Sequence, residues 1–361
     1  MNIGSTKEKN PEKRISITPD TSKNLKDLGL KVFLEKDYGK DLGYSDEEYK
    51  NKGTEFLNSS DEVYSKSDLI CKVNLPAQQE INLLKQNTNL IVSNYDPDKE
   101  KNLIKKNLNV FALNLLPRIT RAQSMDVLSS QANLAGYRAV IESIYEYEKA
   151  VPMMMTAAGT VPAARVLVVG AGVAGLQAIA TAKRLGAIVS ATDVRLTAKE
   201  QVESLGGKFL TVEGSENLET KGGYAKEAGE DFKKKQSEML ENAASKSDII
   251  ICTALIPGKK APRIISESMI KKMKSGSIIF DLAVAQGGNS AYSEVDKVVN
   301  KDGKKIIGIG NVTNKLPLTA SNLYAKNIFS FIRNLYSREK KQFVLNMEDE
   351  IIKNTLIKEG N

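Results

Sequence analysis

Three glycines that follow an apolar segment could hold a dinucleotide. Gly170, Gly172 and Gly175 come directly after the apolar residues 166–169, with the GxGxxG spacing of a dinucleotide-binding turn. In such a turn the first glycine permits a tight bend, the second lets the backbone approach a pyrophosphate, and the third lets helix and strand pack closely. The N-terminus of the following helix offers N–H groups and a partial positive charge to phosphate. The pattern therefore predicts a strand, a phosphate-binding turn and a helix.

A second apolar segment, residues 188–191, leads to an acidic residue, Asp193. A carboxylate at this point accepts hydrogen bonds from a ribose 2′-OH and repels a 2′-phosphate, so Asp193 favours NAD over NADP. Arg195 is ambiguous, because an arginine here can favour a 2′-phosphate. Asp193 has the greater weight because its carboxylate would be the nearer group. The residues of this region expected to bind the cofactor are Gly170, Gly172, Val173, Ala174, Gly175, Asp193, Val194 and Arg195.

The chain contains no histidine and only two cysteines, Cys71 and Cys252. It therefore offers no imidazole as a general base or metal ligand, and too few thiols for a zinc site, so we expect no metal. Catalysis must use Asp, Glu, Lys, Arg, Tyr or Gln, or need no proton transfer to a heteroatom. Both cysteines lie in apolar, strand-like segments, which predicts buried thiols and no disulfide between them.

Composition places the chain among soluble α/β proteins of two domains, with 361 residues of which 41% are hydrophobic. The net charge of +8 comes from lysines spread along the whole chain. There is no basic helix or RNA-binding signature, so we expect no nucleic-acid partner. We find no signal peptide and no apolar run of roughly 18 residues, so we expect no membrane span.

Alternating helix and strand signals on both sides of the glycines predict two parallel sheets. Before them, Thr18 and Pro19 open a helix that closes at Gly29. A helix over residues 124–147 is long enough to bridge two domains, and a linker over 151–165 follows it. The strands expected before the glycines are 31–34, 68–73, 89–92 and 109–112, and those expected after the 166 and 188 strands are 208–212, 248–253, 277–282 and 305–308.

The remaining segments complete the domain assignment. A long polar stretch, residues 213–235, is either functional or disordered. Past Thr319 an amphipathic helix follows, and chains of this layout often return to their first domain. We therefore expect one domain of residues 1–126 with 318–361, and an NAD(H)-binding domain of residues 127–317.

Three segments together carry a resemblance to a known family. They are RITRAQSMD at residues 118–126 with LSSQ at 128–131, MTAAGTVPAARVLVVGAGVAGLQA at 155–178, and GGYAK at 222–226. The chain resembles the soluble NAD(H)-binding component of proton-translocating nicotinamide nucleotide transhydrogenases, in a superfamily that also contains alanine dehydrogenase. The chain ends at Asn361 with no hydrophobic spans following, which favours the form in which the alpha subunit is split into two polypeptides.

The resemblance implies an α/β fold of two Rossmann-like domains, each a parallel sheet flanked by helices, joined by long helices and separated by a cleft. It implies a homodimer that binds NAD(H) and exchanges hydride with NADP(H) on a beta subunit. That transfer is coupled to proton translocation through membrane-spanning partners, the second polypeptide of the split alpha subunit and the beta subunit. The expected location is cytoplasmic, peripheral on the inner face of the bacterial plasma membrane through those partners.

The resemblance also assigns roles to residues. Gln123 would hold the nicotinamide carboxamide and set the ring face, while Arg118, Asp126 and Ser129 would contact or position the nicotinamide–ribose end. Of these, Gln123, Arg118 and Asp126 are the expected catalytic residues. Tyr224 would lie on a mobile loop that closes over NAD. Gln286 and Gly287, in a loop after a strand, are further expected cofactor-binding residues.

Hydride transfer between two nicotinamides exchanges only C–H bonds, so it needs positioning and exclusion of water rather than a base. A chain without histidine can do this. An alanine dehydrogenase-type enzyme, the first alternative, would need a base. In that relative a histidine and an aspartate before a Gln-Gly-Gly triplet do the catalytic work, whereas here the triplet at Gln286 follows Ala285 and only Lys72 matches a substrate-binding lysine.

A second alternative is a protein that binds NAD without turnover. Individual residues also have simpler interpretations. Arg118, Arg121 and Asp126 could form a surface ion-pair loop, and Tyr224 could simply be exposed to solvent.

Overall fold

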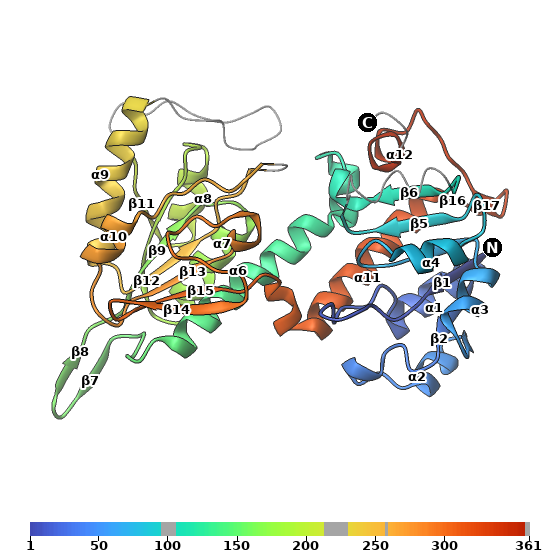
Figure 1. The fold of residues 1–361 in the computed structure, drawn as a ribbon, viewed down its shortest axis with the longest axis horizontal. Helices are drawn as coiled ribbons and strands as arrows, with labels where there is room; N and C mark the ends of the chain where they lie inside the picture. Colours follow the sequence, from blue (N-terminus) through green and yellow to red (C-terminus); the bar gives the residue numbers. More distant parts are fainter. Residues whose placement is uncertain (95–105, 213–229, 257–258, 358–361) are drawn as a thin grey trace. The chain divides into compact units, whose positions relative to one another are not determined.

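The computed structural model describes residues 1–94, 106–212, 230–256 and 259–357. The chain divides into two compact units (Figure 1): the first, unit 1, is Met1–Gln131 with Leu316–Asn361, and the second, unit 2, is Ala132–Lys315. The sequence placed the first boundary after residue 126, but the chain remains with unit 1 through Gln131. The reason is that Ser130 and Gln131 hydrogen-bond to Asn327 and to the Ala320 carbonyl of unit 1.

Unit 1 contains a parallel sheet with strand order β3-β2-β1-β4-β5-β6 among the described residues. Its strands are β1 (Asn2–Ser5), β2 (Lys31–Glu35), β3 (Thr54–Leu57), β4 (Leu69–Cys71), β5 (Asn89–Val92) and β6 (Asn109–Ala112). The expected strands β2, β4, β5 and β6 are confirmed. Strands β1 and β3 were not predicted, because each is four residues long and mixes polar with apolar residues. The chain order reverses between β1 and β4.

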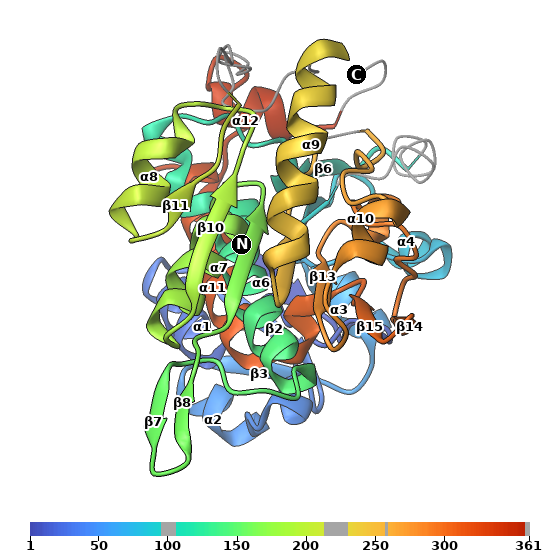
Figure 2. The same cartoon turned by 90° about the vertical axis from the view of Figure 1, so that its left-hand side faces the viewer.

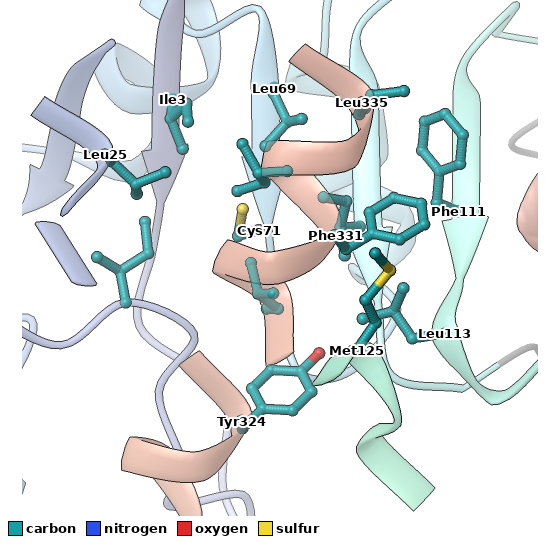
Figure 3. Close-up of a cluster of buried hydrophobic side chains, with 14 of the residues drawn as sticks. Ile3, Leu25, Leu69, Cys71, Phe111, Leu113, Met125, Tyr324, Phe331 and Leu335 are labelled. Atoms are coloured by element: carbon teal, nitrogen blue, oxygen red, sulfur yellow. The ribbon is translucent and has the colours of Figure 1, made fainter. Parts of the chain in front are cut away.

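Helices cover both faces of this sheet, because successive strand residues point to opposite sides. On one face Ile3, Leu69 and Phe111 belong to a core with α1 (Pro19–Asp27) and α11 (Pro317–Leu335). Figure 3 shows Phe331 and Leu335 of α11 within this core. The opposite core contains side chains from α3 and α4. The remaining helices described in unit 1 are η1 (Lys40–Leu42), α2 (Asp46–Asn51), α3 (Ser60–Lys66), α4 (Gln78–Leu83), η2 (Leu113–Leu115), η3 (Thr120–Met125) and α12 (Glu350–Thr355), beside the β16 (Tyr336–Ser337) and β17 (Gln342–Phe343) pair.

Unit 2 contains a sheet with strand order β11-β10-β9-β12-β13-β15-β14, parallel except for β14. Its strands are β9 (Arg165–Val169), β10 (Ile188–Thr192), β11 (Lys208–Phe209), β12 (Ile249–Cys252), β13 (Ile278–Asp281), β14 (Lys297–Lys301) and β15 (Lys304–Gly308). The antiparallel edge strand β14 was not predicted. A turn with positive φ at Asp302 and Gly303 joins it to β15, and Asp-Gly is a common hairpin dipeptide.

Alternation along β9 again separates two cores. Val166 and Val168 pack with residues of α7 (Val173–Arg184) and α8 (Ala198–Ser204). Leu167 and Val169 pack with α9 (Glu230–Lys246) and α10 (Glu267–Lys272). Both cysteines are buried and free, as expected. The short helices η4 (Val284–Gln286) and η5 (Val312–Lys315) complete this unit's described elements.

Residues 151–165, expected to be a linker, contain an antiparallel hairpin of β7 (Met154–Thr156) and β8 (Gly159–Val161). It projects from the rest of unit 2 in both views (Figures 1 and 2). Its side chains are largely exposed, including Met153 and Met155.

Two long helices match the expected ones with shifted ends. The helix expected from residue 124 is η3 followed by α6 (Val127–Glu146). Proline stands in the first turn of α11, and this helix does return to unit 1. Among the residues that the structure describes, no helix is long and apolar enough to cross a membrane.

Candidate dinucleotide site

The three glycines of the turn after β9 each satisfy a different steric requirement. Gly170 has φ +96°, a conformation that favours glycine. A Cβ on Gly175 would lie 1.9 Å from the Gly170 carbonyl oxygen, so only glycine allows this contact between helix and turn. Among the described residues, a Cβ on Gly172 would meet only an Nη2 atom of Arg195, at 4.0 Å. The open space beside Gly172 is where a pyrophosphate could approach the backbone.

The first turn of α7 can supply donors to such a phosphate. Gly172 is the N-cap of this 12-residue helix, and as glycine it has no side chain to cap it. Gly136 of α6 brings a second helix against the same turn, because its Cβ would lie 2.0 Å from the Ala174 carbonyl oxygen. Gly136 was not among the predicted residues, although an isolated glycine in a helical pattern often marks close packing.

Asp193 lies just beyond β10 and fixes the glycine turn. Its Oδ2 accepts the Ala171 N–H at 2.7 Å, and its Oδ1 accepts the Arg195 N–H at 2.9 Å. The Arg195 guanidinium donates to both oxygens, from Nε at 2.9 Å and from Nη2 at 2.8 Å. Burial opposes ionisation of Asp193, but the bonds from Arg195 and from the Ala171 N–H outweigh it and lower the pKa of this carboxyl. The structure therefore brings Asp193 to the turn, as expected, and pairs it with Arg195.

Loops after the neighbouring strands brace the turn. The Thr253 hydroxyl, after β12, donates to the Gly170 carbonyl at 2.9 Å. Asn289 accepts the Ala254 N–H and donates to the Ala254 carbonyl. Buried Asp281, at the end of β13, accepts from the Ser290 N–H and the Ser293 hydroxyl. These residues were not predicted, although a polar residue at the end of an apolar strand was the signal available.

The Gln286–Gly288 triplet forms the turn between β13 and this braced loop. Gln286 ends η4 with an exposed side chain, and Gly287 has φ +102°. Ala285 is exposed beside them and carries no ionisable group. In the turn itself Val173 is exposed, whereas Val194 is half-buried beside Asp193.

The loop expected to bind the nicotinamide end lies in unit 1. η3 buries Ala122 and Met125 in the unit 1 core, and this anchorage leaves Gln123 exposed. Arg118 is also exposed, just before η3. The loop thus presents an amide and a guanidinium on a rigid base.

Asp126 and Ser129 form the start of α6. Asp126 Oδ1 accepts the Ser129 N–H at 2.9 Å, and the Ser129 hydroxyl donates to Oδ2 at 2.5 Å. Arg121 pairs with Asp349 rather than with Asp126, so the simpler ion-pair interpretation fits Arg121. Burial opposes ionisation of Asp349, but bonds from Arg121 and Asn334 lower its pKa. Tyr224 and its Gly-flanked loop lie outside the described residues.

A buried charged cluster stands at the strand ends of unit 1. Lys72, with 2% of its side chain exposed, follows β4 and donates to the Thr6 hydroxyl at 3.1 Å and to the Lys7 carbonyl at 2.9 Å. Its Nζ lies 3.7 Å from Glu8 Oε1 and 3.6 Å from Glu80 Oε1. Burial raises the pKa of Glu8 despite Lys72, while Lys72 and two hydrogen bonds overcome burial and lower that of Glu80. These partners satisfy the ammonium within the protein.

A second buried pair joins Glu12 and Arg14. Arg14 donates to both carboxylate oxygens of Glu12, at 2.8 and 2.7 Å, and to the Gln131 side chain at 3.0 Å. Burial opposes ionisation of Glu12, but Arg14 outweighs it and lowers the carboxyl pKa. In the described ranges, no group of three His, Cys, Asp or Glu residues could hold a metal ion.

Comparison with known proteins adds a family to this geometry. The family models for the N-terminal and C-terminal domains of alanine dehydrogenase/PNT match residues 4–135 and 139–361. The chain is 48% identical over 369 residues to the first polypeptide of the split NAD(P) transhydrogenase subunit alpha of Rhodospirillum rubrum, covering 99% of this chain and 96% of that protein.

A solved structure gives the same result. The transhydrogenase from Sinorhizobium meliloti superposes with a TM-score of 0.90 at 44% identity, covering 100% of this chain and 99% of that one. The alanine dehydrogenase of Methanococcus maripaludis is more distant, at 28% identity over 309 residues, covering 84% of this chain and 76% of that protein.

Proposed function

Because this chain belongs to the alanine dehydrogenase/PNT family, among the NAD(P) transhydrogenase alpha subunits, we propose that it binds NAD(H) and exchanges hydride with NADP(H) on a beta subunit. In the full complex this exchange drives or uses proton translocation across the membrane. The observation that carries the proposal is the glycine turn, whose backbone leaves space at Gly172 beside the N-terminus of α7. Bound NADH would supply a hydride from C4 of its nicotinamide ring.

The chain's own residues would hold the nucleotide from both ends. The N–H groups at the start of α7 would bind the pyrophosphate, and Asp193 would accept hydrogen bonds from the adenosine ribose. Gln286 and Gly287 would border the same nucleotide. Arg118, Asp126 and Ser129 would position the nicotinamide ribose, and Gln123 would bind the carboxamide.

Positioning is then the whole of the catalytic contribution. A carboxamide held by Gln123 fixes which ring face is available, and a fixed near-attack geometry lowers the barrier without proton transfer. The absence of histidine from the chain and the uncharged Ala285 beside the triplet favour this over amino-acid oxidation, which needs a base. Lys72 supports the same choice, because its ammonium is already paired inside unit 1.

The proposed assembly is a homodimer bound to membrane-spanning partners, the second alpha polypeptide and beta, on the inner face of the plasma membrane. The projecting hairpin supports a protein contact, since Met153 is 64% and Met155 is 83% exposed. Large apolar side chains gathered on a surface mark interaction sites more often than they occur by chance.

The test mixes the purified chain with a beta-subunit NADP(H)-binding domain and follows hydride transfer from NADH to an NADP⁺ analogue by absorbance. Transfer that needs both proteins is the expected result. Alanine with NAD⁺ is the control, and NADH formation there with the chain alone would establish the dehydrogenase instead. Binding of NADH with no transfer to any partner would leave the protein a non-catalytic NAD binder.

The role of Gln123 has its own readout. Gln123→Asn should slow transfer far more than it weakens NADH binding, because the pyrophosphate anchor remains while the ring is misplaced. Weaker binding with unchanged turnover of the bound fraction would contradict this role.

A further inference from the structure

The carboxylate of Asp193 has no hydrogen-bonding position left for a ribose. A carboxylate accepts about four hydrogen bonds, roughly two at each oxygen. Asp193 already accepts four, from the backbone N–H groups of Ala171 and Arg195 and from Nε and Nη2 of the Arg195 guanidinium. Each oxygen receives one backbone donor and one guanidinium donor.

The two kinds of donor differ in how easily they can leave. The Ala171 N–H belongs to the glycine turn, so losing that bond would require the turn to change. The guanidinium is the end of a flexible side chain with 18% of its area exposed. Its departure would open one position on each oxygen of Asp193, which matches the two neighbouring hydroxyls of an adenosine ribose.

The guanidinium also lies next to the phosphate-binding end of the site. Among the described residues, its Nη2 is the one atom that comes within 4 Å of a Cβ built on Gly172. The arginine therefore stands between the proposed ribose position and the proposed pyrophosphate position. It is held there by a bidentate pair, a geometry that gives arginine–carboxylate contacts their strength.

We propose that Arg195 occupies the ribose position of Asp193 in the nucleotide-free chain, so that NAD(H) must displace its guanidinium and this competition sets affinity and the choice between NADH and NADPH. The inference rests on the proposed function, because it takes NAD(H) as the ligand. Displacement costs NADH part of its binding free energy. A 2′-phosphate, by contrast, meets a carboxylate whose charge the guanidinium neutralises.

The test is a titration of the full chain with NADH and with NADPH, followed by ligand fluorescence. Arg195→Met should bind NADH about threefold to tenfold more tightly, because the exposed carboxylate then accepts the ribose without competition. The same variant should bind NADPH more weakly, because an uncompensated Asp193 repels the 2′-phosphate. Arg195→Lys should fall between, since a lysine donates from a single atom.

Two comparisons make the result specific. In the Asp193→Asn background, Arg195→Met should give no gain for NADH, because the amide no longer holds the guanidinium. Arg184→Met removes an exposed charge at the other end of α7 and should leave both affinities unchanged. Weaker or equal NADH binding by Arg195→Met, or a gain that persists with Asp193→Asn, would overturn the inference while leaving the proposed function intact. Failure of the unmodified chain to bind NADH would overturn both.

Discussion

The two units carry the same reversal of strand order but treat its central position in opposite ways. In unit 1 the order reverses between β1 and β4, and in unit 2 between β9 and β12. The crevice beyond the carboxyl ends of such a strand pair is where α/β sheets bind ligands. Thr6 and Lys72 follow these strands in unit 1, whereas Gly170 and Thr253 follow them in unit 2.

This difference decides which unit can hold a nucleotide. In unit 1 the ammonium of Lys72 and its two carboxylate partners fill the position with charges that satisfy one another. In unit 2 the glycines leave backbone exposed, and the N-cap of α7 is itself a glycine. The sheet therefore supplies only the place for a site. The few residues directly after the central strands determine whether it is open.

The largest expected effect tests the filled position. Lys72→Met should lower the free energy of unfolding by about 3–5 kcal/mol, because it leaves Glu8 and Glu80 buried without their cation. Urea denaturation at pH 7 measures it. Lys52→Met is the matched control, since Lys52 forms an exposed pair with Asp20 at 3.8 Å and should change stability by less than about 1 kcal/mol. Equal effects of the two substitutions would contradict a distinctive role for the buried cluster.

The open position is tested by two glycines that should respond differently. Gly175→Ala should cost about 3 kcal/mol of stability, because the new Cβ meets the Gly170 carbonyl at 1.9 Å and the backbone must shift. Gly172→Ala should keep the stability of the original chain, because its Cβ enters open space. It should nevertheless weaken NADH binding at least about tenfold, a change of about 1.4 kcal/mol, by blocking the phosphate approach. Thermal unfolding and NADH titration of both variants separate these effects, and unchanged NADH affinity in Gly172→Ala would remove the turn from the site.

The buried pair of unit 1 gives a pH-dependent prediction. Glu12→Gln should lower stability by about 2 kcal/mol at pH 7, because Arg14 loses a charged acceptor. The pKa of Glu12 in the folded protein lies below its ordinary 4.5, so its contribution is present above pH 4.5 and is lost as pH falls through the folded value. The difference between the two proteins should therefore shrink in acid. Urea denaturation at pH 7 and below pH 4 measures it, and a difference that grows in acid would reverse the assigned sign.

Much of this architecture could be predicted from local sequence. The roles of Gly170, Gly172 and Gly175 follow from their spacing, and the structure gives each the expected steric environment. The helix beginning at Pro19, capped by Thr18, was likewise readable from a few neighbouring residues. Short-range geometry fixes such features, so short-range patterns reveal them.

Features that depend on distant segments of the chain could not be predicted. Lys72 lies beside Glu8, which comes from the start of the chain, and Gly136 packs on a turn formed before another helix. For Asp193 the position was predicted but its occupation by Arg195 was not. Most of these contacts exist only after the sheet has brought separate loops together, so composition and spacing carry no signal for them.

The smallest expected effect concerns Thr253, which stands in unit 2 where Lys72 stands in unit 1. Its hydroxyl donates to the Gly170 carbonyl at 2.9 Å and involves no charge. Thr253→Val keeps the shape and removes this one bond, so it should cost about 1 kcal/mol, the usual net value of a neutral hydrogen bond. Thr253→Ser, which retains the hydroxyl, is the control and should keep the bond to the turn. Thermal unfolding of both variants beside Lys72→Met makes the comparison direct: a loss in Thr253→Val as large as that in Lys72→Met would mean that unit 2 also depends on a buried polar cluster, and that its open turn is not the feature distinguishing the two sheets.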